Sequence, residues 1–126
     1  MVYDLLNAAI LVLILVGVAL HHRRLLHAQL MKLCFVLDML LLIAVEFLRS
    51  KPSAVGKAVE TVSSGDNTVL FVHIFFSVCV LVLWVVQLVL GTKVMRGEAA
   101  RLPLHATMAK LFLLVRVGNV VTAFMV

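Results

Sequence analysis

The sequence predicts an all-helical protein, a transmembrane four-helix bundle with up-down-up-down topology and a two-helix internal repeat. Hydrophobic residues make up 64% of the chain and charged residues only 13%, which lies far outside the range of soluble globular domains. Four long apolar stretches follow one another, and two of them open with the same short polar signal. We therefore expect residues 1–126 to form a single integral membrane domain.

The four apolar stretches have lengths that suit a bilayer. A helix rises about 1.5 Å per residue, so about 20 apolar residues cross a hydrocarbon core about 30 Å thick. On this basis the expected helices are residues 3–20, 28–48, 69–91 and 104–126. The segment 49–68 is rich in Ser, Gly and other small residues, and we expect it to be a solvent-exposed loop.

Basic residues indicate the orientation of these helices. The first and third connections, with the helix starts that follow them, carry seven Lys and Arg residues, against Arg49, Lys51 and Lys57 in the second connection. The positive-inside rule therefore predicts that the first and third connections are cytoplasmic and that both termini lie outside. The net charge of +5 suits contact with anionic lipid headgroups, and nothing in the sequence suggests nucleic-acid binding.

The second and fourth stretches open alike, with LLHAQLMK at 25–32 and PLHATMAK at 103–110. His27 aligns with His105, and the alignment continues to Asp38 and Arg116, each eleven residues after its His. Each charge therefore shares a helix face with its His and lies about 16 Å along the helix from it. The repeat predicts two equivalent helices with matching polar faces.

Asp38 and Arg116 are expected near the bilayer centre, where a lone charge costs at least about 2.5–3.5 kcal/mol. Because they are opposite in sign and equal in depth, we predict a buried ion pair across the core. The second and fourth helices of such a bundle run parallel and diagonal, so the same faces would bring His27 and His105 together nearer the cytoplasmic side. The lysines of the two signals, Lys32 and Lys110, fall on the far flanks and need not enter the core.

The third helix extends this pattern into three polar layers. Gln87 is expected at the level of the two histidines, and Trp84 at the level of the ion pair. The outer layer is expected to contain Asn7, Glu46, His73 and Asn119.

The inner layer suggests a haem b site. Two imidazoles that converge from diagonal helices suit a planar macrocycle between them, with His27 and His105 as axial ligands. Basic residues of the cytoplasmic loops are available for the propionates of the haem. Gln87 lies at the same level, and Gly17 on the first helix would let the ring approach closely. The opposing interpretation is that no cofactor is bound and that these polar groups only fix helix contacts.

Copper is an alternative to haem. His27, Met31 and Cys34 share a helix face and offer the soft donors that Cu(I) prefers, and His105 would complete the site. Met and Cys are also ordinary packing residues in apolar helices.

His73 and Glu46 suggest an outer quinone or proton site, since buried acids and imidazoles are typical of proton routes in membranes. Glu46 lies near a helix end and about 80° from the face of Asp38, so its alternative partner is the headgroup layer. For His73 the alternative is a bond to another helix, with Asn7 and Asn119 as partners. No catalytic triad, phosphate-binding loop or zinc-protease motif is present, and we do not predict an enzyme.

The same segments resemble a known family. The resemblance lies in an early Leu-Asn-Ala stretch at 5–17, a His followed by a Met from His27, and His73 and His105 near the starts of the third and fourth helices. These features are similar to the domain of unknown function 420 family, the CtaM/YozB-like four-helix membrane proteins of bacteria. The resemblance implies an assembly or accessory factor of haem-copper oxidases in the bacterial inner membrane, with those three histidines as its site. The charges Asp38 and Arg116 depart from the family pattern.

From the residues and the resemblance we expect an accessory or assembly protein of a respiratory or electron-transfer complex, with haem b between the second and fourth helices. Its expected partners are membrane lipids and other membrane subunits. The alternatives are a cofactor-free structural subunit of a larger membrane complex and a copper-handling membrane protein.

Overall fold

The computed structural model describes residues 2–48, 54–65 and 67–126, and these ranges contain helices and turns but no strand. The predicted all-helical class is confirmed. The elements follow in the order α1 (Val2–Ala19), α2 (Arg24–Leu48), α3 (Ala54–Ser64), α4 (Thr68–Met95), the 3-10 helix η1 (Ala99–Arg101) and α5 (Leu102–Met125).

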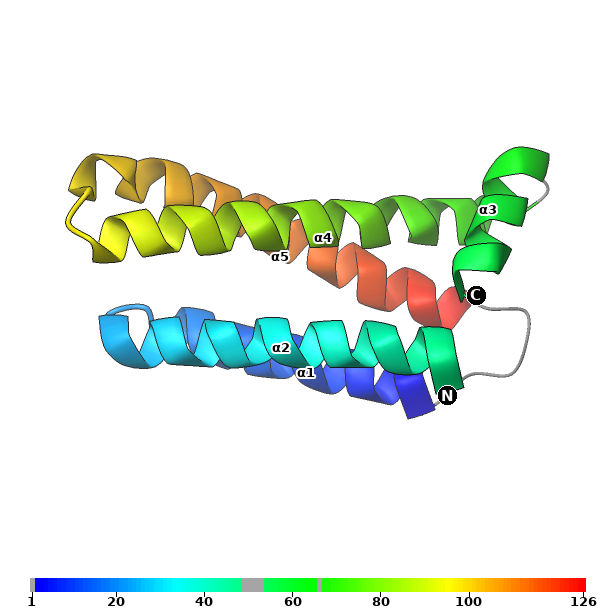
Figure 1. The fold of residues 1–126 in the computed structure, drawn as a ribbon, viewed down its shortest axis with the longest axis horizontal. Coiled ribbons are helices and arrows are strands. Elements are labelled where there is room, and N and C mark those ends of the chain that lie inside the picture. Colours follow the sequence, from blue (N-terminus) through cyan, green and yellow to red (C-terminus); the bar gives the residue numbers. More distant parts are fainter. Residues whose placement is uncertain (1, 49–53, 66) are drawn as a thin grey trace.

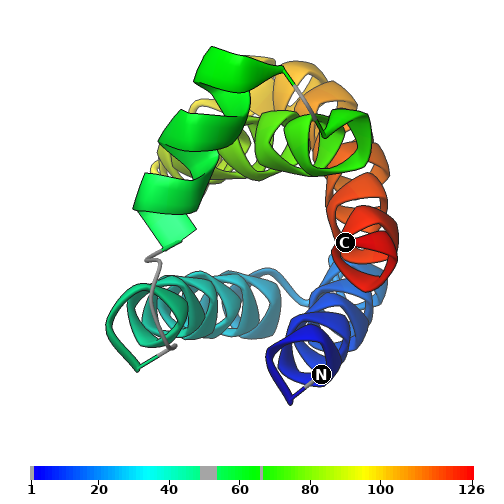
Figure 2. The same cartoon turned by 90° about the vertical axis from the view of Figure 1, so that its right-hand side faces the viewer.

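The four long helices α1, α2, α4 and α5 run in alternating directions along the molecule (Figure 1). α1 packs on α2 and α4 packs on α5, so the chain folds into two helical hairpins. The hairpins meet through α1 and α5, whereas α2 and α4 make the sparsest contact between neighbouring long helices. Seen from the end, the long helices form a ring, and α3 lies across that end on the side of α2 and α4 (Figure 2).

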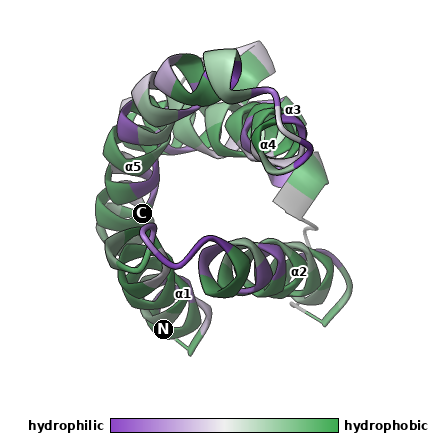
Figure 3. Cartoon of the chain, turned by 90° about the vertical axis from the view of Figure 1, so that its left-hand side faces the viewer, coloured by the Kyte–Doolittle hydropathy of each residue, from purple (hydrophilic) through white to green (hydrophobic). Residues whose placement is uncertain are grey.

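Three segments are long and apolar enough to cross a membrane: α1, α4 and Ala99–Met125. Their large apolar side chains are widely exposed, and Val82 and Leu114, for example, are 57% and 71% exposed. The bodies of the long helices are mainly hydrophobic, whereas the turn between α1 and α2 is hydrophilic (Figure 3). An apolar surface of this extent requires lipid or another apolar surface against it, which indicates a membrane protein.

The apolar core receives a fully buried side chain from each long helix. These residues are Ile14, Cys34, Trp84 and Phe112, none more than 2% exposed. The Trp84 ring lies 4.7 Å from that of Phe112 and 5.7 Å from that of Phe35, measured between centroids. Tilted and edge-to-face aromatic pairs of this kind add to the stabilisation that burial itself provides.

Local signals set the ends of the second hairpin. The side chain of Asn67 caps α4 by accepting a hydrogen bond from Leu70 N at 3.0 Å. After α4, Gly97 adopts a φ of 97°, which only glycine adopts without strain. The amides of Gly97 and Glu98 then donate to helix carbonyls, so α4 runs on to Met95, beyond the expected end at residue 91.

Within the segment 49–68, predicted as a solvent-exposed loop, residues 54–64 form the helix α3, and most of its described residues are exposed. The carboxylate of Glu46 accepts a hydrogen bond from Val55 N at 2.9 Å, at the N-terminus of α3. A negative charge there also offsets the positive end of the helix dipole. Since α2 supplies this capping group, local composition does not reveal it. Arg49 and Lys51, which we counted for the orientation, lie outside the described residues.

Gly118 allows α4 and α5 to approach closely, because a Cβ atom at this position would lie 2.9 Å from Cζ of Phe76. We expect Gly118→Ala to lower the free energy of unfolding by about 1–3 kcal/mol through overpacking. Phe76→Leu in the same chain should recover part of this loss. Thermal unfolding in detergent measures both effects. The control is Val121→Ala, at a half-exposed position of α5, and a loss equal to that of Gly118→Ala would contradict the role of Gly118.

Candidate functional site

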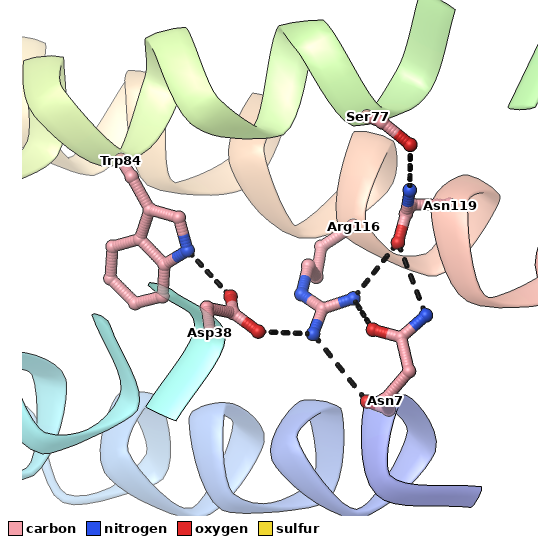
Figure 4. Close-up of polar contacts among 6 residues, drawn as sticks. All are labelled: Asn7, Asp38, Ser77, Trp84, Arg116 and Asn119. Carbon is pink, nitrogen blue, oxygen red and sulfur yellow. Dashed lines mark hydrogen bonds and ion pairs between the residues drawn. The ribbon is translucent and has the colours of Figure 1, made fainter. Parts of the chain in front are cut away.

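One buried polar network links all four long helices, and its centre is the ion pair between Asp38 on α2 and Arg116 on α5 (Figure 4). Asp38 Oδ1 lies 2.8 Å from an Nη atom of Arg116, and the two side chains are 9% and 1% exposed. Asp38 Oδ2 accepts a hydrogen bond from Trp84 Nε1 at 2.6 Å. The ion pair therefore joins α2 to α5 across the core, although these two helices have no backbone contact within the described ranges.

Arg116 also binds groups on α1 and on its own helix. Its second Nη atom donates to the side-chain oxygens of Asn7 at 2.5 Å and Asn119 at 3.1 Å. Asn119 in turn donates to Ser77 Oγ on α4 at 2.8 Å. A buried ion pair is stable only when its other donors and acceptors have partners, and here α1, α4 and α5 itself supply most of them. Of the guanidinium nitrogens, Arg116 Nε has no protein partner among the described residues.

His73 and Glu46 have separate partners and do not form one outer site in the described structure. His73 Nδ1 lies 2.9 Å from Thr122 Oγ1, and the ring also forms a hydrogen bond with the backbone of Asn119, one of its two expected partners. Because the Thr122 hydroxyl donates to the carbonyl of Gly118 at 2.8 Å, it accepts from His73 Nδ1. Glu46 instead caps α3. Both groups thus have structural roles.

A cavity of about 850 Å³ is lined by residues of both hairpins near the turns between α1 and α2 and between α4 and α5. Figure 1 shows that these turns lie at the end of the molecule opposite α3. The wall of the cavity comes from the end of α1, the start of α2, the end of α4 and the start of α5. The volume falls within the range of about 300–1,000 Å³ that is typical of small-molecule and cofactor sites. His27 and His105 both line it, together with Gln87 and Met31. We call it the histidine cavity.

His27 is held by the end of α1. Its Nδ1 lies 2.7 Å from the carbonyl oxygen of Gly17, in the last turn of α1, where helix carbonyls have no helical partner. A carbonyl oxygen only accepts, so Nδ1 carries the proton of the neutral ring and Nε2 carries the lone pair. This bond fixes the orientation of the His27 ring.

His105 packs against Gly91 of α4. A Cβ atom at Gly91 would lie 3.4 Å from Cε1 and 3.9 Å from Nε2 of this ring, so the glycine provides the space that the imidazole occupies. His105 Nδ1 is buried without a protein partner among the described residues, as is Oε1 of Gln87. Buried polar groups without partners are rare and call for an explanation such as a bound ligand.

The different helix ends explain why the two histidines are not equivalent. In the second hairpin the amides that follow α4 already bind the carbonyls of Thr92, Lys93 and Val94. The first hairpin lacks this glycine cap, and the Gly17 carbonyl accepts from His27 instead. The two similar segments at 25–32 and 103–110 therefore place their histidines differently. The His27 ring is oriented by a hydrogen bond at Nδ1, whereas the His105 ring lacks a protein bond at Nδ1.

The ion-pair network also forms the inner end of the cavity. Trp84 donates to Asp38 on one side, and its ring lines the cavity together with Phe112. Trp84 is thus held by the carboxylate and by the Phe112 ring, and the two rings make the inner wall of the cavity apolar.

Several predicted ligands do not reach the cavity. Cys34 is fully buried in the apolar core and is not among the lining residues, so the copper set with His27, Met31 and His105 is not assembled as a whole. No group of three or more His, Cys, Asp or Glu suited to a metal ion occurs in the described part of the chain. Gly17 contacts α2 rather than the cavity, since a Cβ atom there would lie 3.0 Å from Sδ of Met31.

Basic residues were expected near the site, but two of those that line the cavity were placed elsewhere by the sequence reasoning. Lys32 and Lys110 were expected on the far flanks of their helices, but both line the cavity. The long, flexible lysine side chain explains this correction, because its amine is free to lie well to one side of the Cα position. Gly91 was also missed as a site residue, and its signal was its place on the same helix face as Gln87.

The fold and the site define an all-helical membrane protein with a histidine-lined cavity at one end. Comparisons with protein-family models, with curated proteins and with solved structures find no match for this chain. The functional assignment therefore depends on the chemistry of the cavity.

Asp38 and Arg116 should depend on each other for stability. Asp38→Asn and Arg116→Gln each leave one buried charge unpaired, and each should lower the free energy of unfolding by about 3–5 kcal/mol. The double variant should lose less than the sum of the two, measured by chemical unfolding in detergent.

The control for this cycle is Glu98→Gln with Arg101→Gln, because that pair is about half exposed, at 3.4 Å. Removing it should change the free energy of unfolding by less than about 0.5 kcal/mol. Additive losses at positions 38 and 116 would contradict the coupling.

Proposed function

We propose that this protein is a four-helix transmembrane bundle that binds haem b in the histidine cavity, where His27 and His105 would hold the iron. The observation that supports this most directly is that both histidines line one cavity of cofactor size, from helices on diagonal sides of the ring. Two imidazoles on facing helices are a common way to hold haem in a helical bundle.

The residues of the cavity suit this ligand. The Gly17 carbonyl orients His27 so that the Nε2 lone pair is available for a metal. Gly91 leaves room beside His105, and Gln87 has an unpaired buried acceptor in the same cavity. The apolar inner wall of Trp84 and Phe112 matches the face of a macrocycle.

Haem b held by two imidazoles supplies one-electron redox chemistry at its iron. The residues of the chain bind and orient it and exclude water from it. Trp84 and Phe112 keep the surroundings apolar, which together with the histidine hydrogen bond sets the redox potential. The ion pair behind Trp84 keeps this wall in place.

All four long helices cross the membrane in this proposal. α2 carries Lys32, Asp38 and Glu46 and is not among the three segments that are apolar enough on their own. The charge of Asp38 is compensated by Arg116, and the other two residues lie toward opposite ends of the helix, near the headgroups.

The proposed location is the inner membrane of a bacterium, with the histidine cavity toward the cytoplasm and both termini outside. The excess of Lys and Arg at the two hairpin turns supports this orientation. The proposal includes a role as an accessory or assembly protein of a haem-copper oxidase or another electron-transfer complex, because a bound haem would supply one-electron redox chemistry. The exposed apolar faces of the helices suit lipids and membrane subunits as partners.

One observation favours a cofactor-free structural subunit as the second candidate. The network around Arg116 joins four helices without any ligand, and such a network is able to specify helix register alone. Copper handling has less support, because Cys34 does not line the cavity.

The haem proposal predicts a bis-histidine spectrum. Titrated with haem b in mild detergent, the protein should give a shifted Soret band and, on reduction, a sharp α-band. His27→Ala and His105→Ala should each remove this spectrum. His73→Gln should keep it, because His73 lies outside the cavity. Circular dichroism checks that each variant remains helical, and a folded protein that gives no shifted spectrum would refute haem binding.

The orientation has a separate test. In chains with Cys34 and Cys79 replaced by Ser, Ser63→Cys on α3 should react with a membrane-impermeant maleimide added to intact spheroplasts. His22→Cys, in the turn between α1 and α2, should react only after the membrane is opened. Because the two positions lie at opposite ends of the long helices, the reverse pattern would invert the proposed orientation.

A further inference from the structure

The charged residues that line the histidine cavity are all basic. Arg24 and Lys32 come from α2, Arg96 follows the last turn of α4, and Lys110 comes from α5. No Asp or Glu is among the described residues of the wall. Each hairpin thus contributes two positive charges to one cavity.

No acidic residue of the described chain neutralises these charges at the cavity wall. Glu98 is the acid closest to them in sequence, and it pairs with Arg101. Asp38 pairs with Arg116 in the core. Glu46 binds α3 at the other end of the molecule. Uncompensated charges of one sign around a cavity with apolar walls attract and concentrate ligands of the opposite sign.

The cations and the apolar wall occupy different parts of the cavity. All four cations are exposed residues, whereas Trp84 and Phe112 are at most 2% exposed. The cavity therefore has a basic mouth and an apolar inner end. Gln87, itself 9% exposed, adds a buried acceptor without a protein partner between the charged and aromatic residues of α4.

We infer that the histidine cavity selects an amphiphilic ligand and recognises the anionic groups of that ligand. The four cations at the mouth bind these groups, and they are Arg24, Lys32, Arg96 and Lys110. The apolar body of the ligand contacts Trp84 and Phe112. This inference rests on the proposed function and deepens it. In haem b the anionic groups are the two propionate carboxylates, for which charge-assisted hydrogen bonds from Arg and Lys are the strongest available contacts.

The test compares haem b with its dimethyl ester, which lacks both carboxylate charges. In titrations of the full chain in neutral detergent at low salt, haem b should bind about tenfold more tightly than its dimethyl ester. Two partly exposed charge contacts, one for each propionate, provide a difference of this size. The double variant Arg96→Gln/Lys110→Gln should reduce the difference to about threefold, because Arg24 and Lys32 remain at the mouth. Arg101→Gln is the matched control and should keep the difference, because Arg101 pairs with Glu98 and does not line the cavity.

Equal affinity of the natural protein for the acid and the ester would overturn the inference and leave haem binding by the histidines intact. If neither compound binds, the proposed function fails, and native mass spectrometry with added phosphatidylglycerol decides the inference. Lipid retained by the natural protein but lost from the double variant would support anion recognition at the mouth. Equal retention by both would overturn it.

Discussion

The rest of this structure depends on the ion pair between Asp38 and Arg116. The two hairpins meet mainly through α1 and α5, and α2 has little backbone contact with the opposite hairpin. The bond from Asp38 to Arg116 holds α2 across the core, and Asn7, Asn119 and Trp84 supply the remaining hydrogen bonds. In an apolar surrounding neither charge is stable alone, so each requires the other helix in place. The pair therefore fixes the separation of the hairpins.

That separation creates the histidine cavity. Trp84 connects the ion pair to the cavity, because its indole nitrogen donates to Asp38 and its ring forms part of the inner wall. His27 and His105 lie near the starts of α2 and α5, the two helices that the ion pair joins. Both histidines therefore reach the same cavity. Their partners differ because the first hairpin ends α1 with a free carbonyl and the second ends α4 with a glycine cap. A single polar core thus sets both the fold and the site.

Much of this organisation was predictable from spacing along single helices. The all-helical class, the four long helices and the facing positions of Asp38 and Arg116 follow from length, composition and the 3.6-residue period. Contacts that depend on another element were not predictable in this way. Thr122 as the partner of His73, Glu46 as the cap of α3 and the cavity position of Lys32 are examples. Helical periodicity gives the face of a residue, but long side chains and tertiary hydrogen bonds decide its partner.

The central claim is that the ion pair holds the hairpins so that His27 and His105 bind one ligand from opposite sides. Electron paramagnetic resonance of the ferric protein loaded with haem b tests it most directly. Two imidazole ligands produce a low-spin ferric signal. The account predicts this signal in the natural protein and its loss, with helices retained, when either histidine is replaced by Ala. A high-spin signal in the natural protein would mean that the two histidines do not share one iron, and it would contradict the account.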